Sequence, residues 1–203
     1  MKNAPALAII EFRDIPSGID ATDAMLKKAP IAFVKSGTIT RGRFLTLIGG
    51  STAAVEESVS EGLARGGESV LDHLLLADVH PRVYAAILGE RSVGDGGSLA
   101  VIETDTVASN VRAAELALKG TPVVLLELRL ADAGLSGKGV SIYQGELPDI
   151  EAAVDIVLAF MRQTGGEVRH TIISAPHDAL ATQLASSSSF ESTKLLELDG
   201  EVV

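Results

Sequence analysis

The sequence of 203 residues contains no cysteine and no tryptophan, and aromatic residues make up only 3% of it. Without cysteine the chain cannot form disulfides, thiolate metal sites or cysteine-ligated iron–sulfur clusters, and it has no cysteine nucleophile. Because aromatic side chains are scarce, the core must be built from Ala, Val, Leu and Ile. Hydrophobic residues, at 46%, supply enough material for such a core.

Basic clusters and long apolar runs are also missing. The formal net charge is −10, and no stripe of Lys and Arg offers a surface for nucleic acid. No segment reaches the roughly 18 apolar residues of a membrane span. Residues 1–7 lack the basic and apolar regions of a signal peptide. We therefore expect a soluble intracellular protein that binds neither nucleic acid nor membrane.

An internal repeat organises the chain. The string Ala6-Leu-Ala-Ile-Ile-Glu11 returns as Ser98-Leu-Ala-Val-Ile-Glu103, at an offset of 92 residues. Further pairs follow in the same order, at offsets of 92, 95 and 97: Pro30 with Pro122, Gly50 with Gly145, and His80 with His177. The growing offset indicates small insertions in loops between conserved elements. The sequence therefore predicts two copies of one unit.

Each copy shows the same order of elements. In the first copy, strands are expected at residues 7–12, 31–36, 43–48 and 70–76, with a second helix from Ser51. In the second copy, they are expected at residues 99–104, 123–129, 140–144 and 168–173, with a second helix near Leu147. A first helix precedes Pro30 or Pro122, with apolar residues on one face. The order β-α-β-β-α-β predicts a ferredoxin-like α/β (α+β) fold in each copy.

The predicted domains are residues 1–92 and residues 98–185. A linker at residues 93–97 belongs to a glycine-bearing stretch that begins at Gly89. Residues 186–203 form a C-terminal tail that starts at a run of serines. This tail is either disordered or contributes an extra strand at residues 195–198.

The residues of the first copy resemble the bacterial microcompartment shell domain. The resemblance rests on Asp23-Ala-Met-Leu-Lys27, Pro30, the glycines from Gly42 to Gly50, and Ala54-Val55. The second copy repeats it with Glu115-Leu-Ala-Leu-Lys119 and Pro176-His177. Both copies keep the unpermuted order of the family. The chain is thus similar to the tandem-domain, trimer-forming shell proteins.

The chain resembles, in particular, the tandem shell protein of propanediol-utilisation compartments. Its loop Lys-Thr-Ile-Cys-Pro-Gly-Lys corresponds to Gly37-Thr-Ile-Thr-Arg-Gly-Arg43 here. In that type the loop cysteine holds an iron–sulfur cluster, whereas this chain has Thr40 at the position. Cluster binding therefore does not carry over, and we expect no cofactor and no metal.

The resemblance implies a homotrimer with a pseudohexagonal outline and a central pore lined by the hairpin loops of both copies. The expected pore-lining residues are Thr38, Ile39, Thr40, Arg41, Gly42, Ala133, Gly134, Leu135, Ser136, Gly137 and Lys138. Rings of Arg41 and Lys138 would attract small anionic metabolites. The alternative is that both side chains are simply solvated at hairpin tips.

The resemblance also implies tile edges that join the trimer to other shell proteins, namely single-domain hexamers and pentamers, in a microcompartment shell in the cytoplasm. The expected edge residues are Lys27, Lys119, Asp78, His80 and His177. The alternative for each lysine is a solvated side chain in the last turn of a helix, where the dipole favours it. For His80 and His177 the alternative is a structural role beside a proline.

No catalytic arrangement stands out, so the sequence predicts a structural protein and not an enzyme. Neither His73 nor His170 lies in a metal-binding pattern, and no serine lies in a nucleophile elbow. A different class remains open: a soluble trimeric regulatory protein that binds a small ligand between ferredoxin-like repeats. Such a protein would stay as discrete trimers, whereas a shell protein would form sheets, tubes or mixed assemblies.

Overall fold

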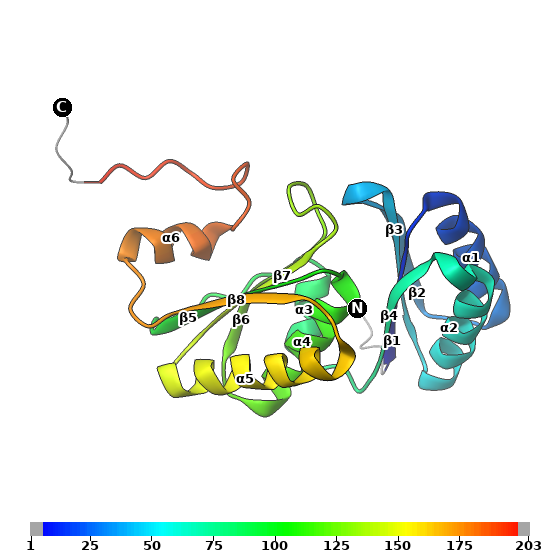
Figure 1. The fold of residues 1–203 in the computed structure, drawn as a ribbon, viewed down its shortest axis with the longest axis horizontal. Coiled ribbons are helices and arrows are strands. Elements are labelled where there is room, and N and C mark those ends of the chain that lie inside the picture. Colours follow the sequence, from blue (N-terminus) through cyan, green and yellow to red (C-terminus); the bar gives the residue numbers. More distant parts are fainter. Residues whose placement is uncertain (1–5, 199–203) are drawn as a thin grey trace.

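The computed structural model describes residues 6–198 and contains two four-stranded antiparallel sheets, one for each copy of the repeat (Figure 1). In domain 1 the elements are β1 (Ala6–Phe12), α1 (Ile15–Lys28), β2 (Phe33–Ile39), β3 (Arg43–Gly50), α2 (Thr52–Gly66) and β4 (Val70–Ala77). In domain 2 they are β5 (Ser98–Thr104), α4 (Val107–Gly120), β6 (Val124–Leu130), β7 (Gly139–Gly145), α5 (Leu147–Thr164) and β8 (Val168–Ile173). Short 3-10 turns lie at Thr40–Gly42 and Gly67–Ser69.

The strand orders are β2-β3-β1-β4 and β6-β7-β5-β8, so the two sheets have the same topology. This arrangement confirms the predicted β-α-β-β-α-β order in both domains. The helices begin where the sequence offers a cap: the side chain of Asp14 accepts from the Ser17 N–H at 2.9 Å, and Ser51 accepts from the Ala54 N–H at 3.3 Å. Within residues 6–198, no helix is long and apolar enough to cross a membrane.

Two further helices, α3 (Pro81–Ile87) and α6 (Asp178–Ser186), were not predicted from the sequence. Each follows the last strand of its domain and begins after a histidine cap. Nδ1 of His80 accepts from the Arg82 N–H, and Nδ1 of His177 accepts from the Ala179 N–H, both at 3.2 Å.

The tail after α6 runs without regular secondary structure as far as residue 198. The extra strand considered for residues 195–198 is therefore absent from the described part of the tail. Residues 199–203 lie outside the described residues.

Each sheet has an inner face, covered by the two long helices of its own domain, and an outer face on the opposite side. In domain 1, Ala8 and Ile10 of β1 pack on the inner face against Met25 of α1 and Val59 of α2. All four side chains are buried.

The outer face of the domain 1 sheet is covered by domain 2. Leu7, Ile9, Leu74 and Leu76 are at most 4% exposed and belong to one core cluster with the apolar face of α4. Burial of such side chains contributes about 1.5–3 kcal/mol each. The two domains therefore share a core and form one packed unit.

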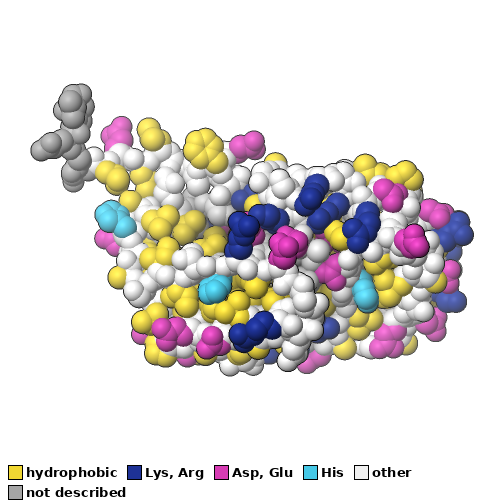
Figure 2. Space-filling model, viewed as in Figure 1, with side chains coloured by type: hydrophobic (Ala, Val, Ile, Leu, Met, Phe, Trp, Pro, Cys, Tyr) yellow, Lys and Arg dark blue, Asp and Glu magenta, His cyan; other side chains and the backbone are white. Residues whose placement is uncertain are grey.

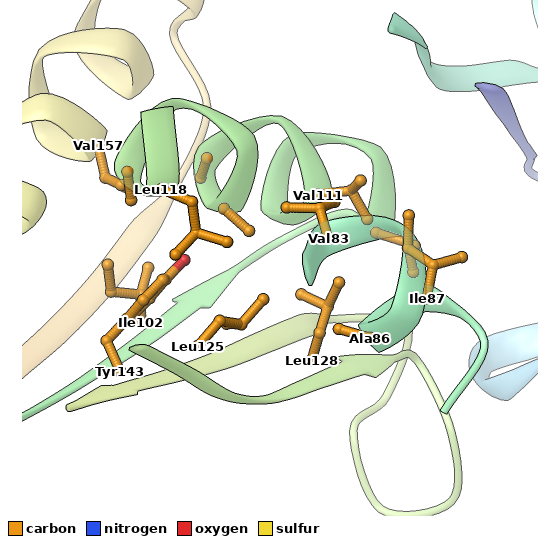
Figure 3. Packing of buried hydrophobic residues seen from close by; sticks show 14 of the residues in the cluster. Val83, Ala86, Ile87, Ile102, Val111, Leu118, Leu125, Leu128, Tyr143 and Val157 are labelled. Carbon is orange, nitrogen blue, oxygen red and sulfur yellow. The ribbon is translucent and has the colours of Figure 1, made fainter. Parts of the chain in front are cut away.

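Helix α3 completes this shared core. Figure 3 shows its residues Val83, Ala86 and Ile87 beside α4 and the strand β6 of domain 2. Although α3 follows the last strand of domain 1 in the sequence, it packs against domain 2 and so joins the two domains. The groove between α4 and β6 is its binding surface.

Candidate pore loops and tile edge

The hairpin loops of the two domains lie against each other, and Thr40 joins them. Oγ1 of Thr40 donates to the carbonyl of Ala131 at 2.8 Å and accepts from the Gly137 N–H at 2.8 Å. The Thr40 N–H also donates to the Ala131 carbonyl, at 3.2 Å. Thr40 is one of the residues predicted to line a pore, and its hydroxyl forms its hydrogen bonds with the loop of domain 2.

Both loops turn sharply through left-handed backbone. Arg41 has φ of 69°, and Ser136 has φ of 51°, although residues with a Cβ rarely adopt this conformation. At Gly137, with φ of 84°, a Cβ would lie 2.9 Å from the guanidinium of Arg43. Glycine is therefore required there so that Arg43 can reach the second loop.

Arg43 connects the first loop to a buried carboxylate and to domain 2. Its Nη1 donates to Glu11 at 2.8 Å, to the Gly137 carbonyl at 3.0 Å and to the Asp105 carbonyl at 3.1 Å. Glu11 is fully buried and also accepts from the Val107 N–H, at the start of α4, at 2.9 Å. Burial raises the pKa of Glu11, and the hydrogen bonds from Val107 and Arg43 oppose that shift. This cluster fixes α4 of domain 2 against β1 of domain 1.

The charged residues near the loop tips differ in how far they are neutralised. Lys and Arg side chains gather along the edge of the molecule where the hairpin loops lie (Figures 1 and 2). Nζ of Lys138 pairs with Glu103 at 2.6 Å, and Arg129 pairs with Asp132. Arg41 is exposed and makes no ion pair or side-chain hydrogen bond with any residue in the range 6–198. Of the two basic residues predicted to attract anions, Lys138 is therefore paired with a carboxylate, and Arg41 is not.

Three of the predicted edge residues come together where domain 1 meets domain 2. Nζ of Lys119 donates to the carbonyl of Asp78 at 2.8 Å and pairs with Glu115 at 2.7 Å. The buried Glu115 carboxylate in turn accepts from the N–H of His80 at 3.1 Å.

The other two predicted edge residues lie apart from this cluster. Lys27 is exposed on α1 and pairs with Asp23 one turn earlier, and His177 caps α6. Within residues 6–198 these two make no hydrogen bond or ion pair with Lys119, Asp78 or each other.

Sequence reasoning missed the carboxylates that organise both regions, Glu11 and Glu115. One signal was available for Glu11: it recurs as Glu103 at the same place in a strand that is otherwise apolar. A charged residue repeated inside a buried strand indicates a fixed partner. For Glu115 no such signal exists, because a glutamate four residues before a lysine is common on solvated helix faces.

Comparison with known proteins agrees with this geometry. The BMC domain family matches residues 6–82 and again residues 98–176. The chain is 32% identical to the bacterial microcompartment shell protein PduT of Citrobacter freundii, over 88% of this chain and 97% of PduT. A crystal structure of a microcompartment protein from Desulfitobacterium hafniense is 33% identical, with a TM-score of 0.75, and the match covers 87% of this chain and 98% of that one. The carboxysome assembly protein CcmO of Synechococcus elongatus is 25% identical over 93% of this chain and 71% of CcmO.

Each matched range contains one of the two four-stranded sheets, and the relatives above are described as shell, assembly or microcompartment proteins. This result confirms the resemblance found in the sequence and supports a structural role. The chain belongs to the BMC domain family and is a shell protein with two such domains in tandem.

Proposed function

We propose that three copies of the chain close into a pseudohexagonal tile in the shell of a bacterial microcompartment in the cytoplasm, with a central pore bordered by the hairpin loops. Two domains of equal topology in each chain supply the six domains of such a ring. The contact inside the chain serves as the template for the contact between copies.

Exposed apolar side chains on α1 and β2 of domain 1, called the open groove below, carry the proposal. Ile19, Leu26 and Val34, on α1 and β2, are 54%, 45% and 42% exposed. The repeat and the strand registers pair them with three residues of domain 2, namely Val111, Leu118 and Leu125. These counterparts are at most 9% exposed because α3 fills the groove between α4 and β6.

The segment that fits the open groove is α6 of the next copy. It is the counterpart of α3 in the repeat, and its Leu180, 41% exposed, corresponds to the fully buried Val83. If α6 of the next copy packs between α1 and β2, the exposed apolar residues of α6, α1 and β2 are covered. Head-to-tail repetition of this contact closes a ring after three copies.

The same symmetry bears on the predicted tile edge. The contact of Lys119 with the carbonyl of Asp78, next to His80, recurs between copies as Lys27 beside His177 of the next copy. All five edge residues then belong to equivalent clusters at the rim of the ring. Edge contacts with single-domain hexamers and pentamers would form there.

For the pore we propose a modest preference for small polar or anionic metabolites. Three copies of Arg41 supply the positive charge, whereas each Lys138 is neutralised by Glu103. Thr40 contributes to the pore by holding the two loops together.

Assembly tests the proposal directly. Light scattering of the purified chain should give three times its 21.0 kDa mass. Electron microscopy, alone or after co-expression with a single-domain shell protein, should show sheets, tubes or shells. Discrete monomers under both conditions would overturn the proposed trimeric tile. For the pore, shells carrying Arg41→Glu should admit an anionic metabolite more slowly than shells carrying the control Arg162→Glu, at an exposed position on α5. Equal rates would reject charge selection.

A further inference from the structure

We propose that Asp14 of one copy forms an ion pair with Arg169 of the next, and that this pair sets the order in which domains join. The inference rests on the proposed trimer and identifies a contact that determines which domain faces which. It follows from a difference between equivalent positions in the two copies of the repeat.

The template is the contact of Asp72, on the outer face of β4, with the start of α4. Oδ2 of Asp72 accepts from the hydroxyl of Ser109 at 2.7 Å and from that of Thr106. Thr106 is also the N-cap of α4, where it accepts from the Ser109 N–H. A carboxylate on the strand thus faces two neutral hydroxyls on the helix.

The equivalent positions between copies carry different charges. At the offset of 92, Thr106 corresponds to Asp14 and Ser109 to Ser17. Asp72 lies opposite Glu11 in the sheet of domain 1, and Arg169 lies opposite Glu103 in the sheet of domain 2, so Asp72 corresponds to Arg169. At the seam between copies, an arginine on the strand therefore meets an aspartate at the helix cap.

Asp14 is held in place for this role. Its Oδ1 accepts from the Ser17 N–H at 2.9 Å, and its Oδ2 accepts from the Ser69 hydroxyl at 2.6 Å. Hydrogen bonds from Ser69 and Ser17 hold the pKa of Asp14 below its usual value, so the carboxylate is charged near neutral pH.

Arg169 is available for the pair. It is exposed and makes no ion pair or side-chain hydrogen bond with any residue from 6 to 198. Glu103 is its neighbour across the sheet but already pairs with Lys138 at 2.6 Å. Arg13, which precedes Asp14 in the chain, has the same charge as Arg169, and its side chain is exposed to solvent.

The charges make the wrong arrangements unfavourable. If β4 of one copy met α1 of another, Asp72 would face Asp14, and two carboxylates would repel each other. If β8 met α4, Arg169 would face hydroxyls already occupied by Asp72. Only the pairing of α1 with β8 of the next copy matches opposite charges, so the pair favours the closed head-to-tail order.

A double-mutant cycle tests the pair in the full chain. Asp14→Asn removes the charge and keeps a good N-cap, and Arg169→Gln removes the positive charge. We expect each single variant to weaken association by about 5-fold per seam. Because three seams close the ring, the overall trimerisation constant should fall by about 100-fold. Sedimentation of a dilution series in low salt measures this constant, and the difference should shrink in 1 M NaCl.

The variant that combines Asp14→Asn with Arg169→Gln shows whether the two side chains interact with each other or affect association independently. It should trimerise no more weakly than either single variant, whereas multiplied losses would show that the two groups act separately and overturn the pair. Asp155→Asn and Arg162→Gln, exposed on α5, are matched controls that should leave the constant unchanged. Unchanged trimers in both single variants would overturn the pair and leave the shell function intact. A wild-type chain that never trimerises would overturn both.

Discussion

Leu26 on α1 and Leu118 on α4 occupy equivalent positions in the repeat, but the same substitution should affect different processes at the two sites. Leu26 is 45% exposed in the single chain, and Leu118 is 9% exposed in the core shared by the domains. Leu26→Ala should weaken association between copies with little effect on folding. Leu118→Ala should destabilise the folded chain.

The magnitudes follow from the area that each side chain loses to water. Truncation of a buried leucine costs about 2–5 kcal/mol, which is the expected loss in free energy of unfolding for Leu118→Ala. Covering the exposed half of Leu26 contributes about 1 kcal/mol per seam. Three seams give about 3 kcal/mol, so the trimerisation constant of Leu26→Ala should fall by about 150-fold.

Two measurements on both variants separate these effects. Urea unfolding is measured at a concentration where the chain is monomeric. It then reports the stability of the subunit alone, because binding to other copies no longer stabilises the folded state. A sedimentation dilution series reports the trimerisation constant. If Leu26→Ala trimerises like wild type, α1 does not lie in a seam, and the derivation from the repeat is wrong. If Leu118→Ala has the same free energy of unfolding as wild type, Leu118 does not contribute to a core shared by the two domains.

Two further predictions concern the junction between the domains. Burial raises the pKa of Glu11, so the stability linked to its protonation is fully present below pH 4.5 and is lost as the pH rises through the folded-state pKa. In urea titrations, the free energy of unfolding of wild type, relative to that of Glu11→Gln, should therefore increase from pH 7 to pH 4.5. A relative decrease would contradict the raised pKa. Thr40→Val removes the hydroxyl that joins the loops. It should lower the free energy of unfolding by about 1–2 kcal/mol and speed hydrogen exchange at the Gly137 amide. The control is Thr38→Val, at an exposed position two residues earlier in β2.

The order of elements could be predicted from the sequence because each copy repeats the same apolar spacing and the same breaks at proline and glycine. The helices α3 and α6 could not be predicted in this way. They have seven and nine residues, too few for a clear helical period. The apolar residues of α3 pack against the other domain, so their role depends on an arrangement that local spacing does not encode.

The positions of the two hairpin loops could be predicted from the sequence, but their contacts could not. The hairpin loops were expected to contain Thr40 and Arg41, and they do. The inward turn of Thr40 and the ion pair of Lys138 with Glu103 depend on residues 91 and 35 positions away in the chain. Such contacts follow from the packing of domain on domain, which a single sequence does not specify.

The two domains also differ in how they fill equivalent space. In domain 1, a Cβ on Gly18 would lie 2.6 Å from the Cβ of Phe44, so a small residue on the helix accommodates a large one on the strand. In domain 2 the equivalent pair is Asn110 and Gly139, and a Cβ on Gly139 would lie 2.4 Å from the Cβ of Asn110. The large and small partners have changed places. Replacing one member by its counterpart from the other copy would therefore create either a clash or a void. Inside the core the copies have therefore diverged by a compensating pair. The proposed pair of Asp14 with Arg169 would be a second exchange of this kind, located at the contact between copies.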